Sequence, residues 1–168
     1  LDETKNLDII SVVGLPVRAF NKLFNCAAVL YKGEILGFVP KVNIPNYTEF
    51  YELRHFSKGI KMKTINYYNK EVPLGYDIIF SCANIPNLKF GVEICEDTWV
   101  NQSPSCDLAK KGANIILNLS ASSEIVGKAK YRKDLLKIHS SKTVTALVCA
   151  SSGSGESTTD MVFAGHNL

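Results

Sequence analysis

Three short, uninterrupted apolar runs in the second half of the chain constrain its fold most. They are LKFGVEIC (88–95), ANIILNLS (113–120) and TALVCASS (145–152). Apolar runs of this length, without alternation of polar residues, are typical of strands that are covered on both faces. Ser103-Pro104 and Gly112 mark the start and stop of a helix between the first two runs, and residues 127–142 predict a second helix before the third. The order β-α-β-α-β predicts an α/β layered sandwich with a mixed sheet.

The first half of the chain has a different pattern. Residues 9–17, 23–31 and 34–40 predict strands, and Lys32-Gly33 is a two-residue connection of the kind that hairpins use. Residues 76–83 and 88–95 predict a further antiparallel pair. The segment 41–57 is expected to be an ordered loop, and 61–75 fits either a loop or a strand at the edge of a sheet.

The length and composition set the class of protein. A chain of 168 residues is enough for one domain with a substantial core, or for a large piece of a bigger domain. The 19 Lys and Arg residues against 16 Asp and Glu give a net charge of only +3, which does not favour nucleic-acid or membrane binding. No transmembrane run and no secretory signal is present in this sequence, so a cytoplasmic location is expected.

The five cysteines are widely spaced and include no CxxC pair. Their spacing therefore suggests neither a metal site nor a redox dithiol. Cys26, Cys82 and Cys149 lie in apolar, strand-like surroundings, where a small buried thiol is the ordinary expectation. We expect a reducing compartment and no metal.

The stretch GVEICED (91–97) sets Cys95 among three carboxylates, Glu93, Glu96 and Asp97. A thiol reacts as its thiolate, and nearby negative charge raises the pKa of a thiol. Two interpretations are open. Cys95 is an inert buried thiol, or it is a nucleophile at a strand end whose compensating positive charge comes from elsewhere in the fold.

Lys41 is the candidate for that charge, because it directly follows the predicted strand 34–40 and precedes a Pro- and Asn-rich aromatic loop. A lysine at a strand end is often only a solvated cap. A lysine that faces a thiolate in a crevice would instead stabilise the charged form of the thiol. The tail SSGSGESTTD (151–160), just past a buried strand, is expected to be an active-site loop.

At this point an ordered set of motifs resembles a known family. PKVNIPNYTEFYELRHF, GVEICEDTW, NLSAS and GESTTDMVFAGHNL occur in the order found in the nitrilase-type amidase domain of glutamine-dependent NAD synthetases, from about residue 14 to the end of the chain. The resemblance implies a nitrilase-like α-β-β-α sandwich with mixed sheets, present here as a fragment. It also implies that residues 1–168 are a single amidase domain truncated at both ends.

The resemblance implies a Glu-Lys-Cys catalytic set. Cys95 would attack the side-chain amide of glutamine, and Lys41 with the following backbone N–H would hold the oxyanion. Glu52 resembles a second glutamate that positions groups and balances charge. The family's general base is an upstream glutamate in a PELxLTGY-type motif, which this sequence lacks, since Glu3 in LDETKNLD does not resemble it. The fragment is therefore expected to be inactive alone.

Five more residues match positions that bind the substrate in this family. Tyr47 and Trp99 resemble pocket walls, although aromatic residues commonly serve only in packing. Glu96 could bind the α-ammonium group of the substrate or be a solvated turn carboxylate. Ser122 and Lys128 match positions that line the glutamine site.

Two basic or glycine-rich features have simpler explanations. The helix with Lys128, Lys130, Arg132, Lys133 and Lys137 is more typical of a solvated face than of a phosphate or nucleic-acid site. Gly153 and Gly155 are not followed by the GK[ST] of a phosphate loop.

The resemblance thus implies glutamine hydrolysis without a cofactor. Ammonia would pass to an ATP- and Mg²⁺-dependent synthetase domain of the same chain, which amidates nicotinic acid adenine dinucleotide to NAD. The expected partners are glutamine, that domain and further copies in a homo-oligomer, with no nucleic acid and no membrane. The rival functions are a stand-alone amidase for another small amide and a non-catalytic assembly domain.

Overall fold

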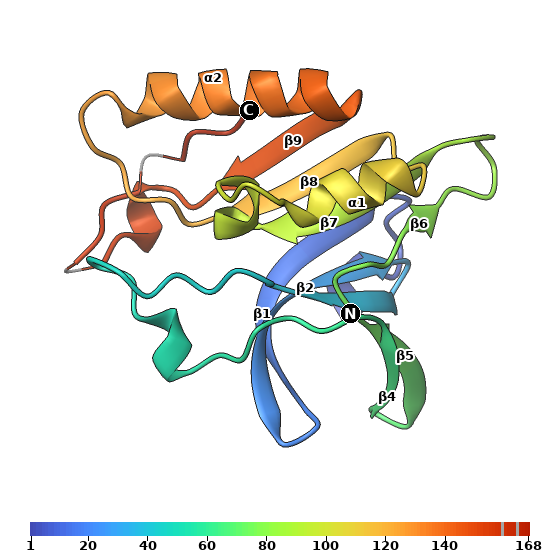
Figure 1. The fold of residues 1–168 in the computed structure, drawn as a ribbon. Helices are drawn as coiled ribbons and strands as arrows, with labels where there is room; N and C mark the ends of the chain where they lie inside the picture. Colours follow the sequence, from blue (N-terminus) through green and yellow to red (C-terminus); the bar gives the residue numbers. More distant parts are fainter. Residues whose placement is uncertain (159, 164) are drawn as a thin grey trace.

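The computed structural model describes residues 1–158, 160–163 and 165–168. The chain forms two packed sheets, and two helices cover the outer face of one of them (Figure 1). The expected α/β layered sandwich with mixed sheets is therefore present. Thr159, in the predicted active-site loop, lies outside the described residues, as does Ala164.

The first sheet is built almost entirely from hairpins. Lys32 and Gly33 turn between two of its strands with φ of 47° and 80°, and Tyr68-Asn69 makes the equivalent turn with φ of 50° and 60°. Positive φ at both central residues is the geometry of the tight turns that match strand twist. The strand order is β1 (Ile10–Ala19), β2 (Lys22–Tyr31), β3 (Glu34–Pro40), β5 (Lys70–Leu74) and β4 (Lys63–Tyr67). Of the two possibilities left open for residues 61–75, the strand is correct.

The second sheet contains the three apolar runs. Its strand order is β6 (Phe80–Ser81), β7 (Lys89–Ile94), β8 (Ile115–Ser120) and β9 (Ala146–Ser151). β7, β8 and β9 are parallel, as the helical connections require, and β6 is antiparallel to β7.

The strand predicted at 76–83 is wrong over most of its length. Only Phe80 and Ser81 pair with β7. The N–H of Tyr76 instead donates to the carbonyl of Ile60, and Asp77 Oδ1 accepts from the N–H of Met62 at 2.7 Å. Residues 76–77 are thus held by the segment that leads into the first sheet.

The helices begin and end near their sequence signals. They are α1 (Pro104–Lys110) and α2 (Lys128–Thr143), and four single 3₁₀ turns are η1 (Asp2–Thr4), η2 (Glu52–Arg54), η3 (Cys95–Thr98) and η4 (Ser154–Glu156). A Cβ added to Gly91 would lie 2.7 Å from Leu108 Cδ1, so at the close approach of β7 and α1 a larger residue fits only if the Leu108 side chain shifts.

The core has two main parts. Ala27, Val29 and Val39 from the first sheet pack against residues of the second sheet such as Val92 and Ile94. On its other face the first sheet has its own cluster, which includes the following buried residues: Phe24, Phe38, Val72 and Leu74. This cluster joins Phe24 of the β1–β2 hairpin to Val72 of the β4–β5 hairpin, and no helix of the described residues belongs to it. The outer helical layer of the expected α-β-β-α sandwich is therefore not seen here, because the first 88 residues contain no segment with a helical pattern.

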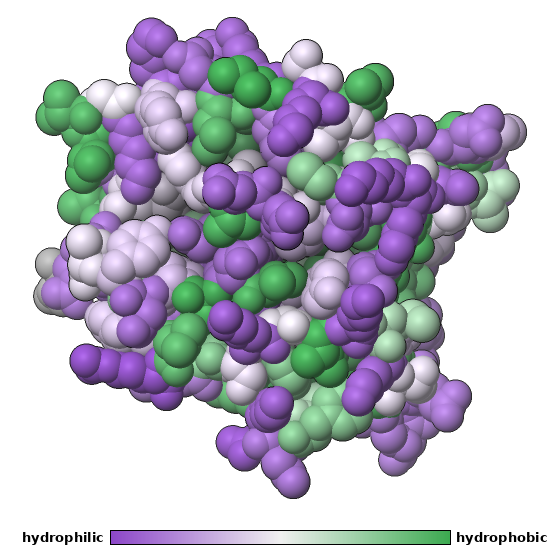
Figure 2. Space-filling model, viewed as in Figure 1, coloured by the Kyte–Doolittle hydropathy of each residue, from purple (hydrophilic) through white to green (hydrophobic). Residues whose placement is uncertain are grey.

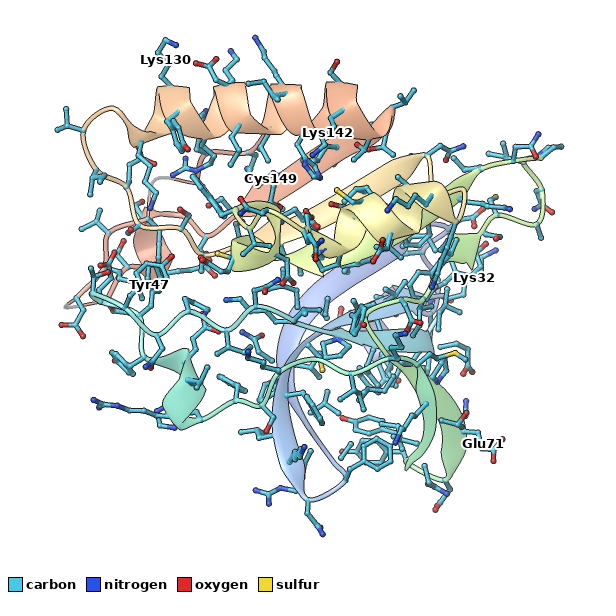
Figure 3. The ribbon with its side chains drawn as sticks, in the orientation of Figure 1. Lys32, Tyr47, Glu71, Lys130, Lys142 and Cys149 are labelled. Carbon is cyan, nitrogen blue, oxygen red and sulfur yellow. The ribbon has the colours of Figure 1, made fainter. Side chains whose placement is uncertain are left out.

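The outer face of α2 is exposed at Lys130, Lys133 and Lys137, as predicted, but the prediction is wrong for Arg132, which is 2% exposed and pairs with Glu124 at 2.8 Å. Arg132, Leu136 and His139 are its buried residues, whereas Lys130 projects away from the sheet (Figure 3). Hydrophilic residues are mixed with hydrophobic ones over this helix and over the face of the molecule shown in Figure 2. Among the described residues, neither helix has the length and apolar character that a membrane crossing needs.

Candidate active site

A pocket of about 450 Å³ lies where strands of both sheets end. Cys95 and Ile94 line it from β7 and the turn that follows, and Leu119 and Ala150 line it from β8 and β9. Its polar lining is the following set: Asn25, Lys41, Glu52, Cys95, Ser120, Ser151, Ser152 and Glu156. The fold thus brings Cys95, Lys41 and Glu52 together, and it places the 151–156 part of the predicted loop at their side.

Cys95 sits at a sharp change of backbone direction. Ile94 ends β7 in an extended conformation, and Cys95 opens η3 with φ of 47°. A non-glycine residue in this left-handed region stores strain, and such residues cluster at functional sites. The turn leaves the thiol partly exposed at the pocket wall rather than buried in the sheet.

Lys41 is 1% exposed and ion-paired. Its Nζ lies 2.7 Å from Glu52 Oε1, and Asn25 Nδ2 donates to Glu52 Oε2 at 3.2 Å. Both oxygens of Glu52 therefore have hydrogen-bond partners. The ion pair of Lys41 is with Glu52, and the structure places the Cys95 thiol in the same pocket.

The fold gives the three carboxylates near Cys95 separate partners. Glu93 is buried and accepts hydrogen bonds from Ser103 Oγ at 2.7 Å, from the N–H of Ser105 at 3.2 Å, and from Thr98 Oγ1. The Ser103 hydroxyl thus donates to Glu93, and the Ser103 side chain does not cap the N-terminus of α1.

Glu96 points to a different neighbour. Its Oε2 accepts from the Tyr47 hydroxyl at 2.8 Å, and burial together with this bond raises the pKa of Tyr47. Neither residue lines the pocket described above.

Asp97 is the third carboxylate and is 1% exposed. Burial raises its pKa to about 6, although hydrogen bonds from Asn43 and from the N–H of Ile94 act in the opposite direction. A carboxylate that ionises near neutral pH, two residues from the thiol, is one of the perturbed groups that gather at functional sites.

The other predicted substrate-binding residues form a cluster beside η3. Trp99 stacks on Tyr131 with ring centroids 5.8 Å apart, and Lys128 Nζ lies 5.8 Å from the centre of the Trp99 ring. Lys128 also donates to Ser123 Oγ at 3.0 Å, and Ser123 Oγ donates to Glu49 Oε1 at 2.9 Å.

Ser122 is buried next to this cluster. Tyr47, labelled in Figure 3, bonds to Glu96, and Lys128 lies against Trp99. None of the five predicted substrate-binding residues, Tyr47, Glu96, Trp99, Ser122 and Lys128, lines the pocket that holds Cys95.

The sequence did not single out two polar groups of the pocket. Asn25 interrupts the apolar pattern of β2, which was a usable signal, and its amide contacts Glu52. Glu156 was noticed only as part of a motif, and its Oε2 accepts from the N–H of Gly153 at 2.9 Å.

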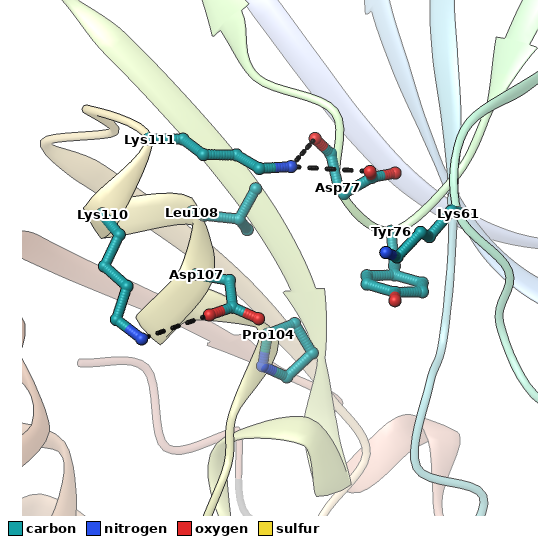
Figure 4. Close-up of a pocket in the computed structure, with 8 residues that line it drawn as sticks. All are labelled: Lys61, Tyr76, Asp77, Pro104, Asp107, Leu108, Lys110 and Lys111. Atoms are coloured by element: carbon teal, nitrogen blue, oxygen red, sulfur yellow. Dashed lines mark hydrogen bonds and ion pairs between the residues drawn. The ribbon is translucent and has the colours of Figure 1, made fainter.

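A second hollow of about 260 Å³ lies between α1 and the segment around Asp77 (Figure 4). Lys110 and Lys111 there pair with Asp107 and Asp77, each at 3.5 Å. It shares no lining residue with the Cys95 pocket.

The remaining thiols are less available. Burial raises the pKa of Cys26 to about 12, and it raises the pKa of Cys149, which lies below α2 (Figure 3). Cys82 and Cys106 are partly exposed but lie outside the pocket. In the described part of the chain, no three His, Cys, Asp or Glu side chains gather as a metal site would require.

The fold and this pocket define a class of protein, and comparison with known families agrees. The model of the carbon-nitrogen hydrolase family matches residues 2–166, and the chain belongs to this family. Its curated relatives include the glutamine-dependent NAD(+) synthetases. The Mycobacterium tuberculosis protein is 38% identical over 167 residues, or 99% of this chain and 25% of the relative, and the human protein is 31% identical over 146 residues, or 80% and 20%.

Solved structures give the same result. A glutamine-dependent NAD(+) synthetase from Cytophaga hutchinsonii superposes with a TM-score of 0.79 at 30% identity, covering 94% of this chain and 25% of that one. Saccharomyces cerevisiae Nit3, of the nitrilase superfamily, superposes with a TM-score of 0.68 at 19% identity over 99% of this chain and 57% of that one, which shows a common fold. The chain spans about a quarter of the length of the synthetases that it matches.

Proposed function

We propose that this chain is the glutaminase part of a glutamine-dependent NAD synthetase, and that Cys95 is its nucleophile. The observation that carries the proposal is the position of Cys95 at a strained strand end in one pocket with buried Lys41 and its partner Glu52. Membership of the carbon-nitrogen hydrolase family and the similarity to glutamine-dependent NAD(+) synthetases support it.

In the first chemical step, the Cys95 thiolate attacks the side-chain amide carbon of glutamine and forms a C–S bond. The carbonyl oxygen becomes an oxyanion, which Lys41 and the backbone N–H after Cys95 stabilise. The tetrahedral intermediate collapses, the C–N bond breaks, and the leaving nitrogen takes up a proton to depart as ammonia. A γ-glutamyl thioester stays on Cys95.

In the second step, water attacks the thioester and releases glutamate, and the thiol is restored. Both steps need a group that accepts and returns a proton. Glu52 is poorly suited to this role because both of its oxygens are engaged. We assign the role to the upstream glutamate of the family motif, and we therefore expect residues 1–168 alone to turn over little glutamine.

The ammonia is proposed to reach an ATP-dependent domain that converts nicotinic acid adenine dinucleotide to NAD. ATP and Mg²⁺ belong to that domain, and glutamine hydrolysis in the present pocket uses neither. Residues beside the pocket are proposed to bind the substrate, with Glu96 and Tyr47 near its ammonium group and Trp99, Ser122 and Lys128 forming the neighbouring wall. We further propose a cytoplasmic location and a homo-oligomeric state.

An ammonia-release assay tests the proposal. The chain is compared with a version that carries, at its N-terminus, the PELxLTGY-type segment of a related synthetase. The extended protein should release ammonia from glutamine, and its Cys95→Ser variant should not. If the extended protein prefers another small amide, the chain is a different amidase. If it releases no ammonia from any amide, the domain is non-catalytic.

A further inference from the structure

We propose that Asp97 is a positioning residue that sets the placement of Lys41 relative to Cys95. Its significance for catalysis rests on the function proposed above, but its effect on the thiol can be measured without glutamine. Asp97 is not among the residues that line the pocket, so it would act through the segments beside Lys41 and Cys95 to which it is hydrogen-bonded.

Four donors converge on this one carboxylate. Oδ1 accepts from the N–H of Asn43 at 2.8 Å and from Asn43 Nδ2 at 2.9 Å. Oδ2 accepts from the N–H of Val42 at 3.3 Å and from the N–H of Ile94 at 3.2 Å. Hydrogen bonds to a charged acceptor are the stronger kind, and a buried carboxylate needs several of them to stay ionised.

The positions of these donors give the carboxylate its role. Val42 is the residue after Lys41, and Ile94 is the residue before Cys95. A single oxygen atom, Oδ2, therefore holds the backbone next to both groups. The bond to Ile94 also closes the η3 turn, since Asp97 is the third residue of that turn and bonds back to the residue before it.

The backbone hydrogen bonds of Lys41 itself do not reach the second sheet. Its N–H donates to the carbonyl of Asn25 at 2.8 Å, and its carbonyl accepts from the N–H of Gly59 at 2.8 Å. β2, which contains Asn25, belongs to the first sheet.

The η3 turn has a second anchor, but that anchor stays within the other layer. Thr98 bonds to Glu93 on β7 and accepts from Asn118 Nδ2 on β8 at 2.6 Å. Asp97 thus carries the hydrogen bonds by which this turn holds the backbone that follows Lys41. Glu96 adds a bond from the same turn to the side chain of Tyr47, farther along that segment, so Asp97 is the group of the turn that holds the backbone next to Lys41.

The rate of Cys95 alkylation by iodoacetamide tests the inference. Peptide mass mapping reports all five cysteines of the same sample, so Cys106 and Cys82 serve as internal references. Asp97→Asn keeps the size of the side chain but turns an amide nitrogen toward N–H donors. We expect Cys95 to react at least about tenfold more slowly, while the two references keep their rates.

Two further variants separate positioning from general loosening. Asn43→Ala removes one of the four donors and should give a smaller decrease at Cys95. In a Lys41→Met background, Asp97→Asn should lower the rate of Cys95 alkylation by less than about threefold, because the effects of two changes that act through one interaction are not additive.

Other outcomes overturn the inference. Equal Cys95 rates in the wild type and Asp97→Asn, or faster alkylation of all the cysteines together, would show that Asp97 only supports the fold. If Asp97→Asn does not fold, an unchanged Cys95 rate in Asn43→Ala has the same meaning. A failed ammonia assay would leave these alkylation results intact, so the two proposals fail separately.

Discussion

The buried carboxyl of Asp97 should make the stability of this protein depend on pH in an unusual direction. Burial raises its pKa to about 6 in the folded protein, against 3.8 for the ordinary side chain. Each unit of pKa corresponds to about 1.4 kcal/mol, so the ionised carboxylate costs the fold about 3 kcal/mol. The neighbouring charge of Glu93 acts in the same direction as burial.

The sign follows from proton linkage. Because the folded protein holds this proton more tightly than the unfolded chain, the stabilising contribution is complete below about pH 4 and is lost as the pH rises through about 6. Carboxylates that are ion-paired in the folded state behave in the opposite way, because pairing lowers their pKa. The fold should thus be less stable at the pH where Asp97 is charged.

Urea unfolding of the wild type and of Asp97→Asn, followed at about pH 4 and at about pH 7.5, measures this contribution. The asparagine does not titrate, so the difference in unfolding free energy between the two proteins isolates Asp97. Relative to the variant, the wild type should lose about 3 kcal/mol between the lower and the higher pH. Asn43→Ala removes a side-chain hydrogen bond that lowers the pKa of Asp97, so this variant should lose more stability than the wild type between the lower and the higher pH. If the difference in unfolding free energy between the wild type and Asp97→Asn does not change with pH, the reasoning is refuted, since Asp97 would then ionise as a solvated carboxyl group does.

Three further changes test the geometry of the site. Cys95→Gly should be more stable than Cys95→Ala by about 1 kcal/mol in urea unfolding, because φ of 47° strains any residue with a Cβ, and equal stability would mean that the turn is relaxed. Gly91→Ala should lower the unfolding free energy by about 1–3 kcal/mol, since its Cβ would meet Leu108 at 2.7 Å. Gly14→Ala, with no atom within 4 Å of the added Cβ, is the matched control for that change. Lys41→Met should slow alkylation of Cys95 by about tenfold without affecting Cys106, and an unchanged rate would remove Lys41 from the account.

The fold of the second half of the chain was readable because its signals were local. Apolar runs without alternation, together with Ser103-Pro104 and Gly112, gave strands and helices close to those observed. The strand predicted at 76–83 failed because residues 76 and 77 bond to the segment at 60–62, a contact between distant parts of the chain that no local pattern records.

The candidate site was predictable only where its signals are local in the sequence. The positions of Cys95 and Lys41 at strand ends could be seen in the sequence, and the strand order of the two sheets brings them into one pocket. The partners of the three nearby carboxylates could not be seen, because each depends on which segments pack against β7. The structure shows how three carboxylates are accommodated beside the Cys95 thiol. Glu93 and Asp97 are buried and accept hydrogen bonds from nearby donors, and Glu96 accepts one from the Tyr47 hydroxyl.

Labelling with diazo-oxo-norleucine, a glutamine-like electrophile, tests the central claim most directly. The protein extended by the upstream glutamate segment of a related synthetase is treated with the reagent, and the modified residue is found by peptide mass mapping. The account predicts modification of Cys95 alone among the five cysteines, slowed by glutamine and unaffected by asparagine. Absence of modification at Cys95, or modification that glutamine does not slow, would contradict the assignment of this pocket as a glutamine site.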